Sequence, residues 1–240
     1  NRELAEVITD AGALKAAYQT VIDAYRLTRI DFDIEGAAAA EPASIERRSQ
    51  AIAMLQQDAA AAGRELRVAF TLPVFPTGLT NQGLDVLKSA LKHGVKIDGV
   101  NIMAMDYGGS AAPNPAGQMG EYANQAATSL FNQIKGLYGS TKSDAEVWDM
   151  VGITPMIGKN DVPGEVFDTT DAQQVLTFAR QNRVGRLSHW SVNRDHNSPG
   201  SNLLYADSGI AQQEFEFSKI FNGITTSTQP RPTAANDTAT

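Results

Sequence analysis

Cysteine is absent from the 240 residues of this chain, which excludes disulfides, thiolate metal sites and a cysteine nucleophile. Histidine is scarce: His93, His189 and His196 stand apart, and no two of them form the i, i+4 pair of a helical zinc site. No glycine-rich phosphate loop follows a strand-like segment, so nothing supports a nucleotide-binding site. We therefore expect the protein to use no metal and no cofactor.

The sequence also lacks long apolar runs and clusters of basic residues. No apolar run approaches the ~18 residues of a membrane-spanning helix, so we expect no transmembrane segment. Lys and Arg number 20 against 27 Asp and Glu, which gives a net charge of −7. Such a chain is not expected to bind nucleic acid or an anionic membrane, whereas a neutral polysaccharide is compatible with this charge. Apolar residues, at 42%, suffice for the core of one large domain or part of one.

The segment Ile30–Gly36 alternates large apolar residues with Asp31, Asp33 and Glu35. Alternation at period two predicts a strand, with the three acids on one face and the apolar side chains packed against helices on the other. Crowded carboxylates repel one another, so at least one should keep its proton at neutral pH. A protonated carboxylic acid is a general acid, which makes this segment a candidate catalytic strand.

Two simpler interpretations compete for the acidic segment. Asp31, Asp33, Glu35 and Gly36 occupy positions 1, 3, 5 and 6 of an EF-hand calcium loop, but Pro42 stands where the bidentate glutamate belongs. The alternative of a solvated edge strand explains the exposed acids, but not the strongly apolar opposite face. Both are less favoured than the catalytic strand.

Helical and strand-like segments alternate along the chain. Helices are expected at 3–26 with a break near 9–12, 43–63, 80–93, 119–137, 170–182 with a capping box at 170–173, and 209–222. Strands are expected at 29–35, 66–72 with prolines stopping the strand, 98–106, 147–154 and 187–192. Five strands joined by helices predict a parallel sheet and an α/β fold. Glu35, Asp106 and Trp190 all fall at strand ends, where a (β/α)8 barrel has its active site.

Three segments carry a resemblance to a known family. The run from Thr28 to Glu35 resembles the signature strand of glycoside hydrolase family 18, the chitinases and their relatives, written D-x-x-D-x-D-x-E. Thr28 replaces the first Asp of this signature, which puts the fine tuning of Asp31 in doubt. Residues 100–108 resemble the sixth strand of the family, and residues 189–195 resemble the eighth, so the resemblance covers roughly 3–222.

The resemblance implies a TIM barrel of which this chain holds strands four to eight. We expect residues 1–222 to form the catalytic domain and 223–240, rich in Thr, Pro and Ser, to form a linker or tail. Five strands alone leave two open edges, so we expect either missing upstream sequence, which we favour, or closure by self-association. A carbohydrate-binding module beyond the linker and an ordinary frayed terminus are equally compatible with the tail.

The resemblance also implies a role for each site residue. Glu35 would be the general acid and base, Asp33 would orient the substrate acetamide, and Asp31 would tune Asp33. This family is an exception among glycosidases because the substrate's own acetamide replaces the enzymic nucleophile.

Substrate contacts are expected from the sixth and eighth strands. Asp106 and Met103 are implied as sugar ligands, and Trp190 as the platform under the sugar. Met105 occupies the position at which relatives often carry a Tyr, and Tyr107 is the candidate to replace that hydroxyl from the loop. Trp148, by contrast, is expected to begin a strand and to pack in the core.

The implied activity is hydrolysis of β-1,4-linked N-acetylglucosamine polymers by a retaining, substrate-assisted chitinase, with chitin or chito-oligosaccharides as partners. An endo-β-N-acetylglucosaminidase, a non-catalytic chitin-binding lectin and an inactive fragment are the alternatives. The presence of Glu35 argues against the lectin, because such relatives typically lose the acid. Residue 1 is not an initiator Met, so an upstream signal is compatible with the expected extracellular location.

Overall fold

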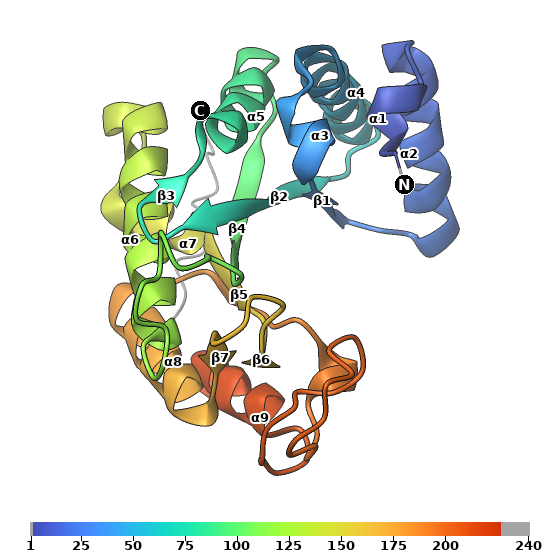
Figure 1. The fold of residues 1–240 in the computed structure, drawn as a ribbon. Coiled ribbons are helices and arrows are strands. Elements are labelled where there is room, and N and C mark those ends of the chain that lie inside the picture. Colours follow the sequence, from blue (N-terminus) through green and yellow to red (C-terminus); the bar gives the residue numbers. More distant parts are fainter. Residues whose placement is uncertain (1, 227–240) are drawn as a thin grey trace.

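The computed structural model describes residues 2–226, and its centre is one parallel sheet (Figure 1). Its five strands are neighbours in chain order: β1 (Arg29–Asp33), β2 (Arg67–Phe75), β4 (Ile97–Ala104), β5 (Val151–Pro155) and β8 (Arg186–Leu187). Each connection therefore leads to the adjacent strand, as in a (β/α)8 barrel. The predicted α/β fold with five parallel strands is confirmed. Within the described residues, β1 and β8 are the two ends of the sheet, and the sheet does not close.

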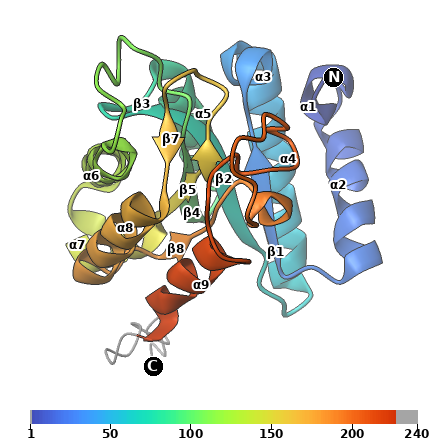
Figure 2. The ribbon, with the colours of Figure 1, turned by 60° about the horizontal axis from the view of Figure 1, so that its bottom comes forward.

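Helices follow the outer side of this sheet (Figures 1 and 2). They are α1 (Leu4–Val7), α2 (Ala11–Tyr25), α3 (Gly36–Ala40), α4 (Pro42–Ala61), α5 (Asn81–Lys92), α6 (Met119–Tyr138), α7 (Asp144–Met150), α8 (Thr169–Asn182) and α9 (Glu216–Asn222). Short strands complete the described fold: β3 (Gly78–Leu79) pairs with β2, and β6 (Gly158–Lys159) pairs with β7 (Val166–Phe167). The strands thus lie inside an arc of helices, so that the two faces of the sheet meet different surroundings.

The two faces of the sheet differ in chemistry. Alternate residues of each strand point toward the helices and are apolar, including Phe32, Phe70, Ile102 and Ile153. Phe70, Ile102 and Ile153 are at most 1% exposed, and burial of such side chains stabilises a fold by about 1.5–3 kcal/mol each. The opposite, inner face carries polar side chains: Arg29, Asp31, Asp33, Thr71, Asp98, Asn101, Thr154 and Arg186. The alternation read in the acidic segment is therefore one case of a pattern that runs across the sheet.

Strand β2 runs through Pro73 to Phe75, so the prediction that prolines stop it at residue 72 is wrong. Thr71 accepts the Ile34 N–H with its carbonyl oxygen, which shows that its backbone polar groups point toward β1. The backbone nitrogen of Pro73, two residues later, faces the same side. The pairing of β1 with β2 has already ended there, so the missing N–H of Pro73 costs no hydrogen bond between strands.

Two other predicted strands are shorter in the structure. Residues 147–150 belong to α7, which a capping box between Ser143 and Glu146 opens, and β5 begins only at Val151. Trp148 therefore lies in a helix, where its ring stacks on Phe131 with centroids 4.3 Å apart, so its packing role is confirmed. The last strand, predicted to reach residue 192, contains only Arg186–Leu187 and is followed by a single bridge between Met156 and Trp190.

Helix ends also differ from the predicted ones. The capping box of α8 consists of Asp168 and Asp171, two residues before the predicted start. Helix α9 begins at Glu216 rather than at residue 209. The segment Gly223–Thr226, expected to start the linker, forms a 3-10 helix, and Arg180 donates a hydrogen bond of 3.0 Å from Nε to the Gly223 carbonyl oxygen. The rest of the predicted linker, 227–240, lies outside the described residues.

Candidate active site

The three acids lie at the carboxyl end of β1. Asp31 and Asp33 project from one face of this strand, and Glu35 follows the strand end as the first residue before helix α3. All three side chains are exposed, while Ile34 between them is 1% exposed and anchors the segment in the core. Because Asp31 and Asp33 belong to a regular strand that pairs with β2, the segment is not a calcium-binding loop.

The charges of this row act most strongly on Asp33. Partial loss of hydration, together with the neighbouring negative charges of Glu35 and Asp31, raises the pKa of Asp33 to about 6. A carboxyl group with this pKa is partly protonated near neutral pH. The expectation that the crowded row keeps a proton thus finds a physical basis at Asp33, the middle acid.

A cavity of about 640 Å³ opens beside the last two acids. It is lined by Arg2, Glu3, Glu6, Asp33, Glu35, Gly36, Ala37 and Ala38. The wall opposite β1 is formed by the segment before and within α1, and a buried arginine fixes this wall. Arg48, 1% exposed, donates hydrogen bonds of 3.1 and 2.5 Å to the two carboxylate oxygens of Glu3, and Tyr18 donates a third of 3.2 Å. No sequence pattern predicted this contribution of the N-terminal segment.

The end of β4 holds the predicted sugar ligands Met103 and Asp106. Met103 is half-buried in the strand, next to Pro73 of β2 and Thr154 of β5. Asp106 is half-buried in the following loop, where its Oδ1 accepts the Val162 N–H at 3.0 Å. Burial raises the pKa of Asp106, against the opposing effect of this hydrogen bond. One oxygen of Asp106 thus holds a neighbouring loop, and the carboxylate stands at the same edge of the sheet as the acidic row.

Tyr107 is only 3% exposed, and its ring packs edge-on against Tyr122 with centroids 6.2 Å apart. Burial also raises the pKa of its hydroxyl. This environment gives no support to the prediction that Tyr107 presents its hydroxyl to a sugar. Met105, at the position where relatives often carry Tyr, is half-buried.

Trp190 follows β8 and is 53% exposed. Its backbone is fixed on both sides, because its N–H donates to the Pro155 carbonyl oxygen at 2.9 Å and its carbonyl accepts the Ile157 N–H at 3.0 Å. An exposed indole on a fixed backbone is a rigid apolar surface of the kind that ligands stack on. The geometry suits the platform role expected of Trp190.

Several charged residues around these loops are structural, and no sequence pattern predicted this role for Glu165 or Arg194. Glu165, 2% exposed, accepts the N–H groups of Tyr107 and Gly108 at 3.1 and 2.7 Å. Arg194 is fully buried and donates to the carbonyl oxygens of Ile157 and Lys159 at 2.7 and 2.6 Å. These contacts fix the shape of the loops that carry the candidate sugar ligands.

Asp195 is also buried and caps α9 by accepting the N–H groups of Phe217 and Ser218. Hydrogen bonds from Ser218 and neighbouring groups lower the pKa of Asp195, although burial alone would raise it. Its polar position after Trp190 therefore serves the fold rather than the cleft.

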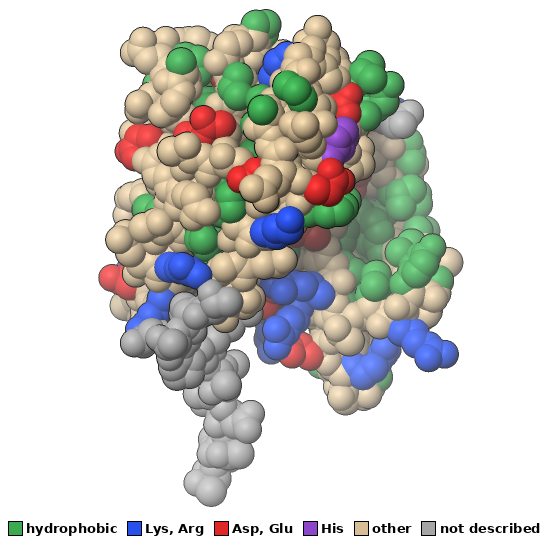
Figure 3. Space-filling model, turned by 90° about the horizontal axis from the view of Figure 1, so that it is seen from below, with side chains coloured by type: hydrophobic (Ala, Val, Ile, Leu, Met, Phe, Trp, Pro, Cys, Tyr) green, Lys and Arg blue, Asp and Glu red, His purple; other side chains and the backbone are tan. Residues whose placement is uncertain are grey.

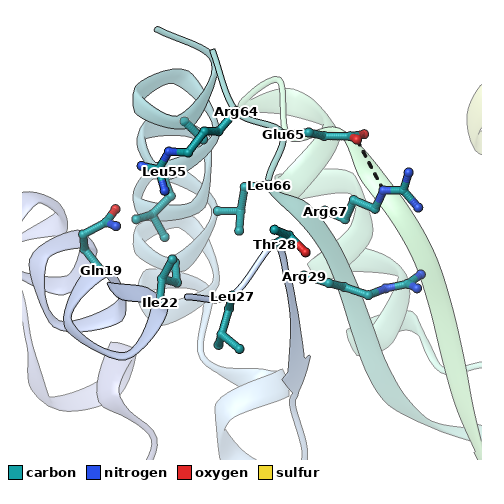
Figure 4. A pocket seen from close by; sticks show the side chains of 11 residues that line it. Gln19, Ile22, Leu27, Thr28, Arg29, Leu55, Arg64, Glu65, Leu66 and Arg67 are labelled. Carbon is teal, nitrogen blue, oxygen red and sulfur yellow. Dashed lines mark hydrogen bonds and ion pairs between the residues drawn. The ribbon is translucent and has the colours of Figure 1, made fainter. Parts of the chain in front are cut away.

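A second pocket, of about 490 Å³, lies at the amino ends of β1 and β2 (Figure 4). Thr28 immediately precedes β1 and Leu66 immediately precedes β2 there, and Arg67 pairs with Glu65 at 3.4 Å on the rim of the pocket. This pocket is at the end of the strands opposite to the acids, so it is not part of the candidate site. Figure 3 shows the molecule from below, where its surface is hollowed and basic and acidic side chains meet along the hollow.

Among the described residues, no three His, Asp or Glu side chains are arranged to hold a metal ion. No helix within 2–226 is both long and apolar enough to cross a bilayer.

Solved structures and sequence relatives agree on the kind of protein. The catalytic-site mutants of active domain 2 of a chitinase from Pyrococcus furiosus match with a TM-score of 0.81 and 34% identity, over 94% of this chain and 69% of that one. This chain belongs to the family 18 chitinases. Another structure of that domain is a complex with chito-oligosaccharides. It matches with a TM-score of 0.79 and 34% identity, over 91% of this chain and 67% of that one. No protein-family model matches the sequence.

Two sequence relatives of this chitinase-family chain are much longer proteins. A probable bifunctional chitinase/lysozyme of Escherichia coli (strain K12) is 40% identical over 94% of this chain and 26% of its own length. Endochitinase 11 of Metarhizium anisopliae is 42% identical over 81% of this chain and 38% of its own length. The chain thus spans about a quarter to two fifths of these relatives.

Proposed function

We propose that this protein is a chitinase that hydrolyses β-1,4-linked N-acetylglucosamine polymers with retention of configuration. The observation that carries the proposal is the pair Asp33 and Glu35 on one cavity wall, with the pKa of Asp33 raised to about 6. The names of the relatives support the substrate, since one of the solved chitinase structures is a complex with chito-oligosaccharides.

The proposed reaction begins with protonation of the leaving glycosidic oxygen by the Glu35 carboxyl group. The 2-acetamido oxygen of the same sugar attacks C1 as the C1–O bond breaks, which gives a cyclic oxazolinium ion and an ionised Glu35. Glu35 then takes a proton from a water molecule as the water oxygen attacks C1 and opens the ring. Two displacements at C1 retain its configuration, and Glu35 returns to its protonated form.

Asp33 acts on the acetamide in this scheme. It accepts the acetamide N–H, which orients the carbonyl oxygen toward C1, and its negative charge stabilises the oxazolinium ion. Asp31 lies one residue pair deeper in the strand and shares a proton with Asp33. Because the middle acid has the raised pKa, its protonation state is the one most easily changed when a sugar binds.

Trp190, Asp106 and Met103 are the proposed substrate contacts at the carboxyl ends of β8 and β4. Trp190 offers the exposed apolar face, Asp106 its remaining acceptor capacity, and Met103 a polarizable side chain. Tyr107 is left out of this set because it is buried. Chitin is a large polymer outside cells, so we further propose that the protein acts extracellularly and takes part in polysaccharide degradation.

The test is the initial rate of hydrolysis of a fluorogenic chitobioside by the full chain and by Glu35→Gln. We expect the substitution to lower turnover by about 10²–10⁴-fold, because Gln cannot transfer a proton. Glu65→Gln makes the same change on the exposed surface at the other end of the strands, and it should leave the rate unchanged. Near-normal turnover in Glu35→Gln, or a parent chain that folds and binds chitobiose without hydrolysing it, would overturn the proposal and favour a lectin.

A further inference from the structure

A chain of hydrogen bonds crosses four strands of the sheet and ends on the acidic row. Thr154 on β5 donates from Oγ1 to Asn101 Oδ1 at 2.9 Å. Asn101 on β4 donates from Nδ2 to Thr71 Oγ1 at 3.2 Å, and Thr71 on β2 donates to Asp31 Oδ1 at 2.6 Å. All four side chains lie on the inner face of the sheet, and each belongs to a different strand.

The donor and acceptor groups of these side chains set the direction of this series of hydrogen bonds. The Asn101 amide nitrogen can only donate, so the Thr71 oxygen accepts there and its own hydrogen is directed at Asp31. With the amide turned the other way, Thr71 would donate to Asn101, and two oxygens would face each other at 2.6 Å with no proton from Thr71 between them. Asp31 Oδ1 therefore accepts this hydrogen bond, and a donor of this kind favours the ionised form of a carboxyl group over the neutral one.

The neighbouring strand leaves space for this arrangement. Gly152 on β5 is the register partner of Asn101, and a Cβ atom at that position would come within 2.8 Å of Asn101 Oδ1. Asn101 itself is 7% exposed, and both ends of its amide are hydrogen-bonded. A buried amide that is hydrogen-bonded through both its oxygen and its nitrogen resists rotation, because breaking either bond leaves an unpaired polar group.

We propose that Thr71, oriented by Asn101 and Thr154, is a positioning residue that keeps Asp31 ionised and thereby leaves the proton of the acidic row on Asp33. The inference deepens the proposed function, on which its catalytic consequence rests. Its electrostatic part concerns this chain alone and is testable without substrate.

Other charged groups face Asp31 and act beside Thr71. Arg186 of β8 approaches Asp31 Oδ2 with Nη1 at 3.7 Å and favours the ionised form, whereas Asp33 on the same strand disfavours it. The remaining charged residues on this part of the inner face are Arg29 and Glu35 of the β1 segment, Arg67 of β2 and Asp98 of β4. Arg29 and Arg186 both pair with Asp98, and Thr71 donates to Asp31 at 2.6 Å.

The consequence for Asp33 follows from the repulsion between the Asp31 and Asp33 carboxylates. Without the Thr71 hydroxyl, the ionised form of Asp31 loses a hydrogen-bond donor, which favours a shift of the proton of the acidic row toward Asp31. Asp33 then faces a neutral neighbour instead of a negative one, and its own pKa falls. The proton thus moves from the middle acid to the deeper one.

The experiment measures the free energy of unfolding from pH 4 to pH 8 for the full chain, Asp33→Asn, Thr71→Val and the double variant. The difference in unfolding free energy between a protein and its Asp33→Asn variant changes with pH between the unfolded-state and folded-state pKa values of Asp33. The upper end of this change, called the midpoint below, reports the folded-state pKa of Asp33. We expect this midpoint to move toward acid by about one pH unit in the Thr71→Val background. Thr71→Ser keeps the hydroxyl and should restore the parent midpoint, and Thr128→Val, whose hydroxyl bonds a helix carbonyl, should not move it.

An unchanged midpoint in Thr71→Val, with both proteins folded, would overturn the inference. The activity readout separates this result from a failure of the proposed function. If the chain hydrolyses a chitobioside, Thr71→Val should change kcat about 10-fold with little change in KM, because it alters a proton position and not a sugar contact. A shifted midpoint without chitobioside hydrolysis in the parent would support the positioning role of Thr71 and reject the chitinase activity.

Discussion

Glu165 and Gly108 are joined by a hydrogen bond of 2.7 Å across 57 residues of sequence. The same carboxylate accepts the Tyr107 N–H at 3.1 Å, and Asp106 returns a contact by accepting the Val162 N–H. The loop after β4 and the loop that contains β6 and β7 therefore hold each other. This clasp fixes the backbone on which the candidate sugar ligand Asp106 stands.

Glu165→Ala should lower the free energy of unfolding by about 2–4 kcal/mol, because it leaves two buried backbone N–H groups without an acceptor. Glu165→Gln should lie between Ala and the parent, since a carboxamide offers only one accepting oxygen. Urea denaturation measures both, with Glu65→Ala on the exposed surface as the control. Equal stability of Glu165→Ala and the parent would show that the hydrogen bonds of Glu165 contribute nothing to the free energy of unfolding.

Asp33→Asn should stabilise the protein more at pH 7 than at pH 4. The pKa of Asp33 is raised to about 6 in the folded chain, above its ordinary value of 3.8, so folding disfavours its ionised form. The parent therefore loses stability relative to Asp33→Asn as the pH rises through this window, and the loss stays above it. Thermal melts at the two pH values measure the effect, and Asp85→Asn on the surface of α5 is the control. A larger gain at pH 4 than at pH 7 would contradict the raised pKa.

Trp190 should report sugar binding by its fluorescence, because the sequence contains only one other tryptophan. Trp148 is packed between Phe131 and Phe178, so its emission should not respond to ligand. Titration with chitotriose should change the emission of Trp148→Phe but not that of Trp190→Phe. Trp190→Ala should weaken binding about 10-fold, or ~1.4 kcal/mol. A response that survives in Trp190→Phe would exclude the platform role.

Gly152→Ala should destabilise the fold by about 1–3 kcal/mol, because the new methyl group would press on Asn101. Gly136→Ala makes the same change in α6, where no atom lies within 4 Å of the added carbon. That control should gain about 0.5–1 kcal/mol from helix propensity. Guanidinium denaturation compares the two variants. An unchanged free energy of unfolding in Gly152→Ala would mean that the inner face accommodates a methyl group beside Asn101.

The acidic strand was predictable because its signal is local. Residues 30–35 alternate at period two, and the packing of Phe32 and Ile34 on the helix side follows from that alternation. The start of α7 was also readable, since the capping box of Ser143 and Glu146 lies in the sequence, but the apolar run after it suggested a strand. Local patterns thus predicted the elements better than their ends.

The residues that support the site were not predictable in the same way. Glu165 and Asn101 act on groups 57 and 30 residues away, and a single Glu or Asn carries no periodic signal. Tyr107 shows the converse case: its sequence position suggested a sugar contact, whereas in the structure its ring is buried against Tyr122. Tertiary contacts decide such cases, because the chain direction after a strand end is set by what it packs against.

The proposed chemistry is tested most directly by comparing initial hydrolysis rates of two fluorogenic disaccharides that differ only at C2, a chitobioside and the corresponding cellobioside. The acetamide is the proposed nucleophile, so the chitobioside should be hydrolysed by the parent and not by Glu35→Gln, and the cellobioside should react at least about 10³-fold more slowly. Comparable rates on both sugars would contradict substrate assistance and with it the roles given to Asp33 and Glu35.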